Sequence, residues 1–207
     1  MNWTEPSGDT GAWMRVFVAI NPPPGIVGAL RKLQRHLQQE LPGDDIRWVP
    51  ADQIHLTLRF IGDLDPQRLE PLIAAIDEAC RPVSPFNLAV GGLGVFPEGP
   101  HPRVIWTGLT GDLTALQQLR TSVDTVCGTL GIRREEHEFR PHLTLARVKR
   151  LEPDGFTRLA GLIDAPEWRS LGEWHVDRAE LIQSILAPKG ATYKPLETFS
   201  LGPASDS

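Results

Sequence analysis

Two identical tetrapeptides place a histidine and a threonine at the same spacing. The sequence His-Leu-Thr-Leu occurs at 55–58 and again at 142–145, each time inside an apolar run and each time with an arginine downstream. In a β-strand, residues i and i+2 point to the same side, so the imidazole and the hydroxyl share one face while the leucines anchor the strand in a core. The polar pairs are His55 with Thr57, and His142 with Thr144.

Paired imidazoles suit acid-base chemistry at phosphorus. Histidine has an unperturbed pKa of about 6.5, so one imidazole can act as a base while another, protonated, acts as an acid near neutral pH. Displacement at phosphorus needs both, because the attacking water or hydroxyl loses a proton and the leaving ester oxygen gains one. A single His-x-Thr on a half-buried strand is usually a hydrogen-bonded boundary pair. Two copies favour chemistry, because β-propensity alone would select Val or Ile rather than His.

A metal site is the rival use of paired histidines. Structural zinc takes four ligands and catalytic zinc three, and neither motif has an adjacent carboxylate or thiol. The glycines of 90–96 lack the spacing of a nucleotide-binding loop and are interpreted as strand or bulge residues. We therefore expect neither a metal nor a cofactor. The other histidines also lack ligand spacing: His36, His101, His137 and His175.

The composition is that of a compact globular protein. The 207 residues carry a net charge of −5, which argues against binding nucleic acid through a broad basic surface. Basic residues do gather at 133–150, around the second motif, where they allow a local phosphate site. Cys80 and Cys127 are expected to be reduced core residues. Because the sequence shows neither a signal peptide nor a long apolar run, we expect a cytoplasmic protein with no membrane segment.

Hydrophobic periodicity predicts interleaved strands and helices with frequent hairpins. Helices are predicted at 22–41, 65–80, 112–131 and, more weakly, 153–163. Strands are predicted at 14–20, 46–49, 55–62, 86–96, 103–109, 142–148, 173–186 and 192–201. This order favours an α+β fold with antiparallel or mixed sheets. A single domain is expected over 14–202, with a flexible extension at 1–13 and a flexible tail at 203–207.

The two halves of the chain share an order of elements. Each offers a helix, a strand with His-Leu-Thr-Leu and a neighbouring hairpin. A duplicated, two-lobed architecture in which the motif strands face each other would explain that order.

Beyond the motifs, five segments resemble one family. The sequence is similar to the 2H phosphoesterase superfamily, and within it to the RNA 2′,3′-cyclic phosphodiesterases, also called 2′-5′ RNA ligases. The resemblance extends over about residues 14–202 and is absent from 1–13. The segments that carry it are RVFVAI, RWVPADQIHLTLRFIGD, GVFPEGPHPRVIWTGL, FRPHLTLARVK and IQSILAPKGATYKPLETFSL.

The resemblance implies a fold, a reaction and a set of site residues. It implies a bilobal α+β fold with two sheets facing a central cleft, helices on the outer faces, and metal-free hydrolysis of a 2′,3′-cyclic phosphate RNA end to a 2′-phosphate. His55 and His142 would then be catalytic, His142 activating water and His55 protonating the departing O3′. The remaining positions are Thr57 and Thr144 for the phosphate oxygens, Phe60 for stacking a terminal base, and Arg147 for the nucleotide.

Two other functions stay open. The same centre could join 2′-5′ linked RNA ends, or the cleft could bind RNA ends without turning them over. The expected partner is an RNA with a 2′,3′-cyclic phosphate end, with tRNA fragments among the candidates, and the expected state is a monomer.

Overall fold

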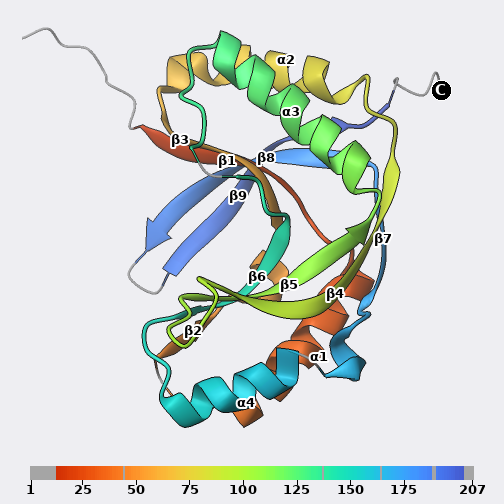
Figure 1. Cartoon of the computed structure of the whole chain (residues 1–207). Coiled ribbons are helices and arrows are strands. Elements are labelled where there is room, and N and C mark those ends of the chain that lie inside the picture. The colour runs from red at the N-terminus through yellow and green to blue at the C-terminus, as the bar shows by residue number, and fades with distance from the viewer. Residues whose placement is uncertain (1–12, 44, 137, 164, 188–189, 203–207) are drawn as a thin grey trace, which may run out of the picture.

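Two antiparallel sheets form the framework of the computed structural model, which describes residues 13–43, 45–136, 138–163, 165–187 and 190–202. The first sheet has the order β3-β1-β8-β9 and the second the order β2-β6-β5-β4-β7 (Figure 1). The first sheet contains β1 (Met14–Ile20), β3 (Leu56–Leu64), β8 (Arg178–Ala187) and β9 (Gly190–Ser200). The second contains β2 (Ile46–Trp48), β4 (Phe86–Phe96), β5 (Val104–Gly111), β6 (His142–Val148) and β7 (Gly172–Val176). The sheets are thus antiparallel, one of the two arrangements that the sequence favoured.

Two helices cover the outer face of each sheet (Figure 1). Helices α2 (Leu69–Cys80) and α3 (Leu113–Thr129) pack on the first sheet, and α1 (Pro24–Glu40) and α4 (Pro153–Ile163) on the second. Apolar residues recur along one side of α1 at helical spacing, and that side is buried. Asp112 caps α3 by accepting a hydrogen bond of 2.9 Å from the backbone N–H of Ala115. The predicted helices are therefore confirmed, including the short one at 153–163.

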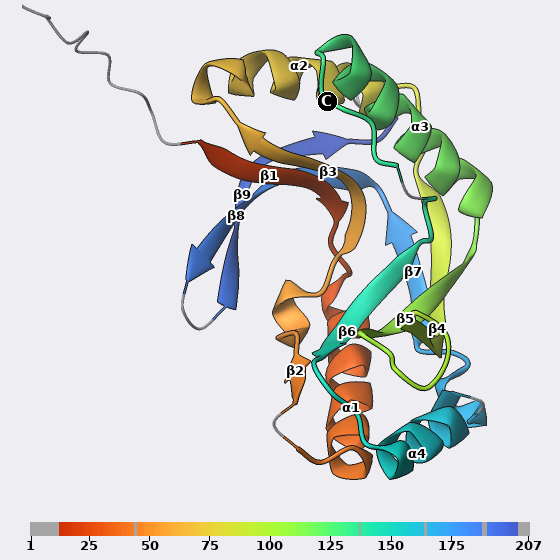
Figure 2. The ribbon, with the colours of Figure 1, turned by 60° about the vertical axis from the view of Figure 1, so that its left-hand side comes forward.

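A strand–helix–strand unit occurs twice. In the first unit β1 and β3 pair side by side, and in the second β5 and β6 do the same. The helix between the paired strands covers the other sheet: α1 packs on the second sheet and α3 on the first (Figures 1 and 2). The helix that follows the motif strand covers the sheet to which that strand belongs, which is the first sheet for α2 and the second for α4. The duplicated bilobal α+β fold is thereby confirmed, with the lobes built from segments that alternate along the chain.

The C-terminal part differs from the expectation in one respect. The alternating segment 173–186 was predicted as a single strand, but it divides at Asp177 into β7 of the second sheet and β8 of the first. The polar-apolar alternation is interrupted at this point, because Asp177 and Arg178 are adjacent polar residues and the apolar positions move from Trp174 and Val176 to Ala179 and Leu181. The single predicted strand overlooked this interruption. The predicted pairing of β8 with β9 is confirmed.

Several other expectations concern burial and the chain ends. Cys80 and Cys127 are free and buried, as predicted, and burial raises the pKa of the Cys80 thiol to about 12. None of the helices in the described ranges is long and apolar enough to cross a membrane. The expected extension and tail lie outside the described residues, except for the exposed Trp13.

Candidate functional site

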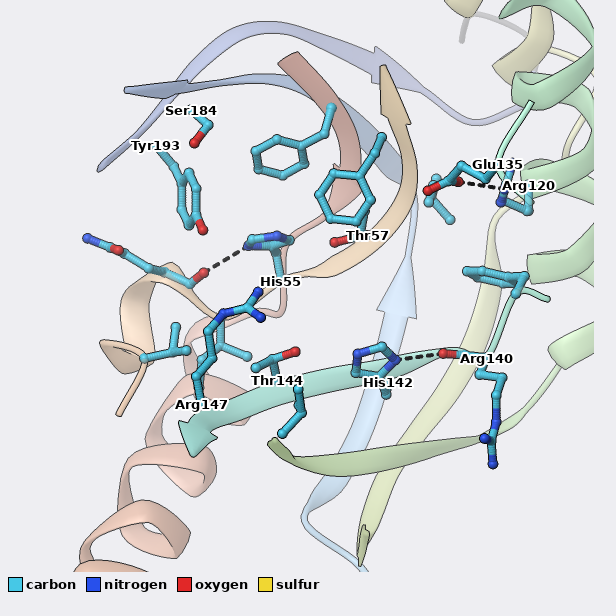
Figure 3. Close-up of a pocket in the computed structure, with 18 of the residues that line it drawn as sticks. His55, Thr57, Arg120, Glu135, Arg140, His142, Thr144, Arg147, Ser184 and Tyr193 are labelled. Atoms are coloured by element: carbon cyan, nitrogen blue, oxygen red, sulfur yellow. Dashed lines mark hydrogen bonds and ion pairs between the residues drawn. The ribbon is translucent and has the colours of Figure 1, made fainter. Parts of the chain in front are cut away.

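A cleft of about 440 Å³ lies between the two sheets, with walls from both lobes. The motif strands β3 and β6 contribute to opposite walls. The structure brings together all six residues that the sequence singled out: His55, Thr57, Phe60, His142, Thr144 and Arg147 (Figure 3).

The two imidazoles are anchored in the same way. Nδ1 of His55 lies 2.8 Å from the carbonyl oxygen of Gln53, and Nδ1 of His142 lies 2.6 Å from that of Arg140. A carbonyl oxygen only accepts hydrogen bonds, so each Nδ1 carries a hydrogen and donates it. Nε2 is then the acceptor in each neutral ring, and it is the atom that can exchange a proton with a bound molecule.

Aromatic rings flank each histidine. The His55 ring stacks on Phe17, with 4.8 Å between centroids and 30° between planes, and meets the edge of Tyr193 at 5.0 Å and 89°. The His142 ring lies edge-on to Phe96 at 5.1 Å, with Trp106 at 6.3 Å. These rings limit the contact of the imidazoles with water.

Glycines of β4 shape the wall behind His142. Gly92 has φ 74° at a β-bulge, and the ring of Trp106 occupies the space where a Cβ on Gly94 would lie, at 2.2 Å. These glycines are therefore strand and bulge residues, as the sequence interpretation proposed.

The electrostatics of the cleft favour neutral imidazoles. Burial is the main cause that lowers the pKa of His55 from 6.5. The hydrogen bond to the Gln53 carbonyl opposes this effect, and the charges of Arg147 and His142 lower the pKa further. Burial also lowers the pKa of His142, with the charges of Arg140 and Arg147 adding to it and its hydrogen bond to the Arg140 carbonyl opposing it. The positive charge of the Arg147 guanidinium therefore lowers the pKa of both imidazoles.

The threonines and Phe60 complete the predicted set. Thr57 and Thr144 are half-buried in the cleft wall, each beside the histidine of its own motif. The side chain of Phe60 is 55% exposed although it lines the cleft, with its centroid 5.9 Å from that of Phe17. An exposed aromatic ring at the rim of a polar cleft is available for stacking on a planar ligand.

The arginines that follow the two motifs have different surroundings. Arg147 lines the cleft, whereas the side chain of Arg59 is 0% exposed and is not among the residues that line it. A register shift between β1 and β3 falls between Thr57 and Arg59 and reverses the alternation that follows, so Arg59 pairs with Asp124 of α3 while Phe60 lines the cleft. The arginine after the first motif is thus not part of the site, contrary to what the repeated pattern indicates.

Several cleft residues come from segments that sequence reasoning did not connect with the motifs. Phe17 was recognised only as part of a buried strand and Tyr193 only as part of the last hairpin. No sequence signal places them beside His55, because the contact depends on how β1, β3, β8 and β9 pair. Other polar members of the lining are Arg15, Gln53, Arg120, Glu135, Glu138, Arg140 and Ser184.

The donor set of the cleft suits oxygen atoms rather than a metal ion. Hydroxyl and guanidinium groups bind phosphate oxygens, and neither is an ordinary ligand of zinc. Within the described parts of the chain, no group of three or more His, Cys, Asp or Glu side chains could hold a metal ion. Independence from metal stays a prediction.

Comparison with known proteins gives matches over most of the chain. The family model of the LigT-like phosphoesterases matches residues 20–106 and 111–193. A protein of Archaeoglobus fulgidus named RNA 2′,3′-cyclic phosphodiesterase is 35% identical over 191 residues, which cover 90% of this chain and 99% of the relative. One of the same name from Thermus thermophilus is 33% identical over 192 residues, covering 91% of this chain and 90% of the relative.

Solved structures share the fold. The crystal structure of TT0787 of Thermus thermophilus superposes with a TM-score of 0.72 at 31% identity, over 92% of this chain and 100% of that one. Escherichia coli LigT in its apo form gives a TM-score of 0.72 at 24% identity, over 93% and 99% of the two chains, a likeness of fold alone. With the family model covering most of its length, this chain belongs to the LigT-like phosphoesterase family.

Proposed function

We propose that this protein hydrolyses a 2′,3′-cyclic phosphate at an RNA end to a 2′-phosphate, without metal, by acid-base catalysis. The observation that carries the proposal is the convergence of two identically anchored imidazoles, His55 and His142, from opposite sheets on one cleft. The names of relatives that match nearly their whole length support the substrate class.

The proposed reaction divides two proton transfers between the histidines. Nε2 of His142 takes a proton from water as its oxygen attacks phosphorus, the bond from phosphorus to O3′ breaks, and Nε2 of His55 gives a proton to O3′. The product is a 2′-phosphate monoester with a free 3′-hydroxyl. Exchange of protons with solvent then restores neutral His142 and protonated His55.

The assignment of acid and base follows from where the nucleoside would lie. Phe60 lies on β3 and His55 immediately precedes this strand, so a base stacked on Phe60 brings its ribose, and with it O3′, to the side of His55. His142, from the second sheet, then faces the opposite side of phosphorus, where water arrives. Thr57, Thr144 and Arg147 would hold the non-bridging oxygens.

Loss of either threonine hydroxyl is expected to reduce turnover less than loss of a histidine. Thr57→Val and Thr144→Val remove one donor among several while keeping the shape of the side chain. We expect kcat to fall about 10- to 10³-fold in each variant. Steady-state kinetics on a nucleoside 2′,3′-cyclic phosphate would measure this, and wild-type kcat in both variants would contradict phosphate binding by the hydroxyls.

The pH dependence of kcat/KM should place the optimum on the acid side of pH 6.5. This ratio reports the free protein, in which the pKa values of both histidines are lowered, so the protonated acid is lost as pH rises through a value below 6.5. The apparent values belong to the pair. In Arg147→Met the profile should move to higher pH, because the charge of Arg147 lowers both pKa values. A monotonic profile, or one unmoved in Arg147→Met, would contradict this.

A product assay tests the reaction itself. A short RNA with a 2′,3′-cyclic phosphate end is incubated with the protein, with and without EDTA, and the products are separated against 2′- and 3′-phosphate standards. We expect the 2′-phosphate alone, at an equal rate with EDTA. A 3′-phosphate or a need for added metal would contradict the mechanism. Binding without cleavage would favour an RNA-end binding module, and a predominant 2′-5′ joined product would favour a ligase.

We further propose RNA ends, including those of tRNA fragments, as the cellular partners of a cytoplasmic monomer. The relatives' names support RNA. The free, buried thiols of Cys80 and Cys127 fit a reducing compartment. A monomer fits a cleft whose two walls come from one chain.

A further inference from the structure

The cleft-facing side of the first sheet has an apolar cluster of its own. Phe17, Ala19 and Ile182 are buried there, with Tyr193 packed against them, and they form a cluster separate from the main core. Helices α2 and α3 cover the opposite side of this sheet (Figure 2). The cluster therefore packs against groups of the cleft, and the group that contacts both of its aromatic members is His55.

Three contacts fix the His55 ring. The face of the ring lies on Phe17, the edge of Tyr193 meets it at 89°, and the Gln53 carbonyl holds Nδ1. Tyr193 also meets Phe17 edge-on, with 5.3 Å between centroids and 79° between planes, so the three rings support one another. Face-to-edge arrangements at these distances are the favourable geometry for aromatic rings.

We infer that Phe17 and Tyr193 are positioning residues that hold the His55 imidazole in one orientation and exclude water from it. Tyr193 lies on β9 and Phe17 on β1, so the last strand of the chain completes a site whose histidine precedes β3 (Figure 3). The effect of this orientation on catalysis rests on the proposed function, whereas the contacts that hold the His55 ring do not depend on it. The rings beside His142 are Phe96 and Trp106, so the two histidines have separate supports.

The charged groups that act on His55 come from β6. They are Arg147 and His142, and both lower the pKa of His55. From β1 and β9 the neighbours are the uncharged rings of Phe17 and Tyr193, and the turn before the motif contributes the Gln53 carbonyl. Removal of the Tyr193 ring therefore leaves these charges in place and admits water, so the pKa of His55 should rise toward 6.5.

Tyr193 allows a test that needs no activity, because it is the only tyrosine in the chain. Tyrosine labelled with carbon-13 in the ring gives one set of ring signals, which report on the imidazole beside the ring. We expect the signals to follow a single titration with a midpoint below 6.5. The titration should vanish in His55→Gln and move to higher pH in His142→Gln. A shift independent of pH, or a titration that persists in His55→Gln, would overturn the contact.

Kinetics then test the positioning. Tyr193→Phe keeps the ring and should retain kcat within about 3-fold, whereas Tyr193→Ala should lower kcat about 10- to 100-fold with little change in KM, because misplaced reacting groups cost rate. The pH profile should also move to higher pH in Tyr193→Ala, because the pKa of His55 rises. Leu196→Ala is the matched control, since Leu196 lies on β9 and packs against the main core instead.

The outcomes separate the inference from the proposed function. If Tyr193→Ala and Leu196→Ala give the same kcat and the same pH profile, Tyr193 is not a positioning residue, whatever the reaction. If the purified protein cleaves no cyclic phosphate but the Tyr193 signals titrate with His55, the proposed reaction fails and the restraint on the ring stands.

Discussion

Replacing His142 by alanine is expected to lower kcat on a cyclic-phosphate RNA end by about 10²- to 10⁴-fold, and replacing His55 by a similar factor. Each variant removes the Nε2 atom that exchanges a proton with the reacting group in the proposed mechanism, and no other titratable side chain holds an equivalent place in its motif. The carbonyls of Gln53 and Arg140 lose their donors but lie beside a cleft from which water can replace them. The fold should therefore persist, with little change in melting temperature.

A matched control and a double variant sharpen this prediction. His175 is an exposed histidine on β7 whose side chain forms a hydrogen bond with the side chain of Asn87, and it does not line the cleft. His175→Ala should therefore keep wild-type kcat. If His55 and His142 act on one phosphorus, the double alanine variant should lose less than the product of the two single losses. Near-normal turnover in either single variant would contradict two-histidine catalysis.

Arg59→Met is expected to reduce the free energy of unfolding by about 3 kcal/mol, because it breaks a buried ionic network. The Arg59 guanidinium is completely enclosed, and its Nε lies 2.9 Å from Asp124 without hydrogen-bond geometry, so the attraction is between charges. Arg59 and Arg120 both pair with Asp124 and Glu135. Without Arg59, two partly buried carboxylates share one arginine.

The network also ties the cleft wall together. It joins β3 and α3 to the segment before β6, which contains Glu135 and the Arg140 carbonyl that anchors His142. Urea unfolding would measure the change, with Arg81→Ala as the control, because the exposed pair of Arg81 with Asp77 should contribute at most about 1 kcal/mol. Equal stability of the two variants would show that the Arg59 network is not stabilising.

Local periodicity predicted most of the elements and the core of the site. The spacing of His142 and Thr144 on alternate positions of a strand places both on one face whatever the rest of the chain does. The same holds for His55 and Thr57, whose shared face precedes the first register shift of β3. For this reason both His-Thr pairs could be predicted from the spacing of four residues alone.

The remainder depends on pairing between distant strands. The register shift before Arg59 reverses the sides of the strand that Arg59 and Phe60 face. In the run RFIGD the sequence shows no sign of the shifts other than Gly62, a glycine that adopts a positive φ. The contact of Tyr193 with His55 requires that β9 lie two strands from β1 in the first sheet. The division of 173–186 between the sheets differs from these cases, because the adjacent polar residues Asp177 and Arg178 interrupt the alternation and mark the break in the sequence.

A crystal structure of the protein with a nucleoside 2′-phosphate, the proposed product, bound in the cleft would show whether both imidazoles reach one phosphate. We expect a single phosphate between the lobes, with Nε2 of His55 and Nε2 of His142 each within about 3 Å of its oxygens or of the ribose 3′-hydroxyl. A phosphate bound beside only one imidazole, with the other ring out of reach, would contradict two-histidine catalysis.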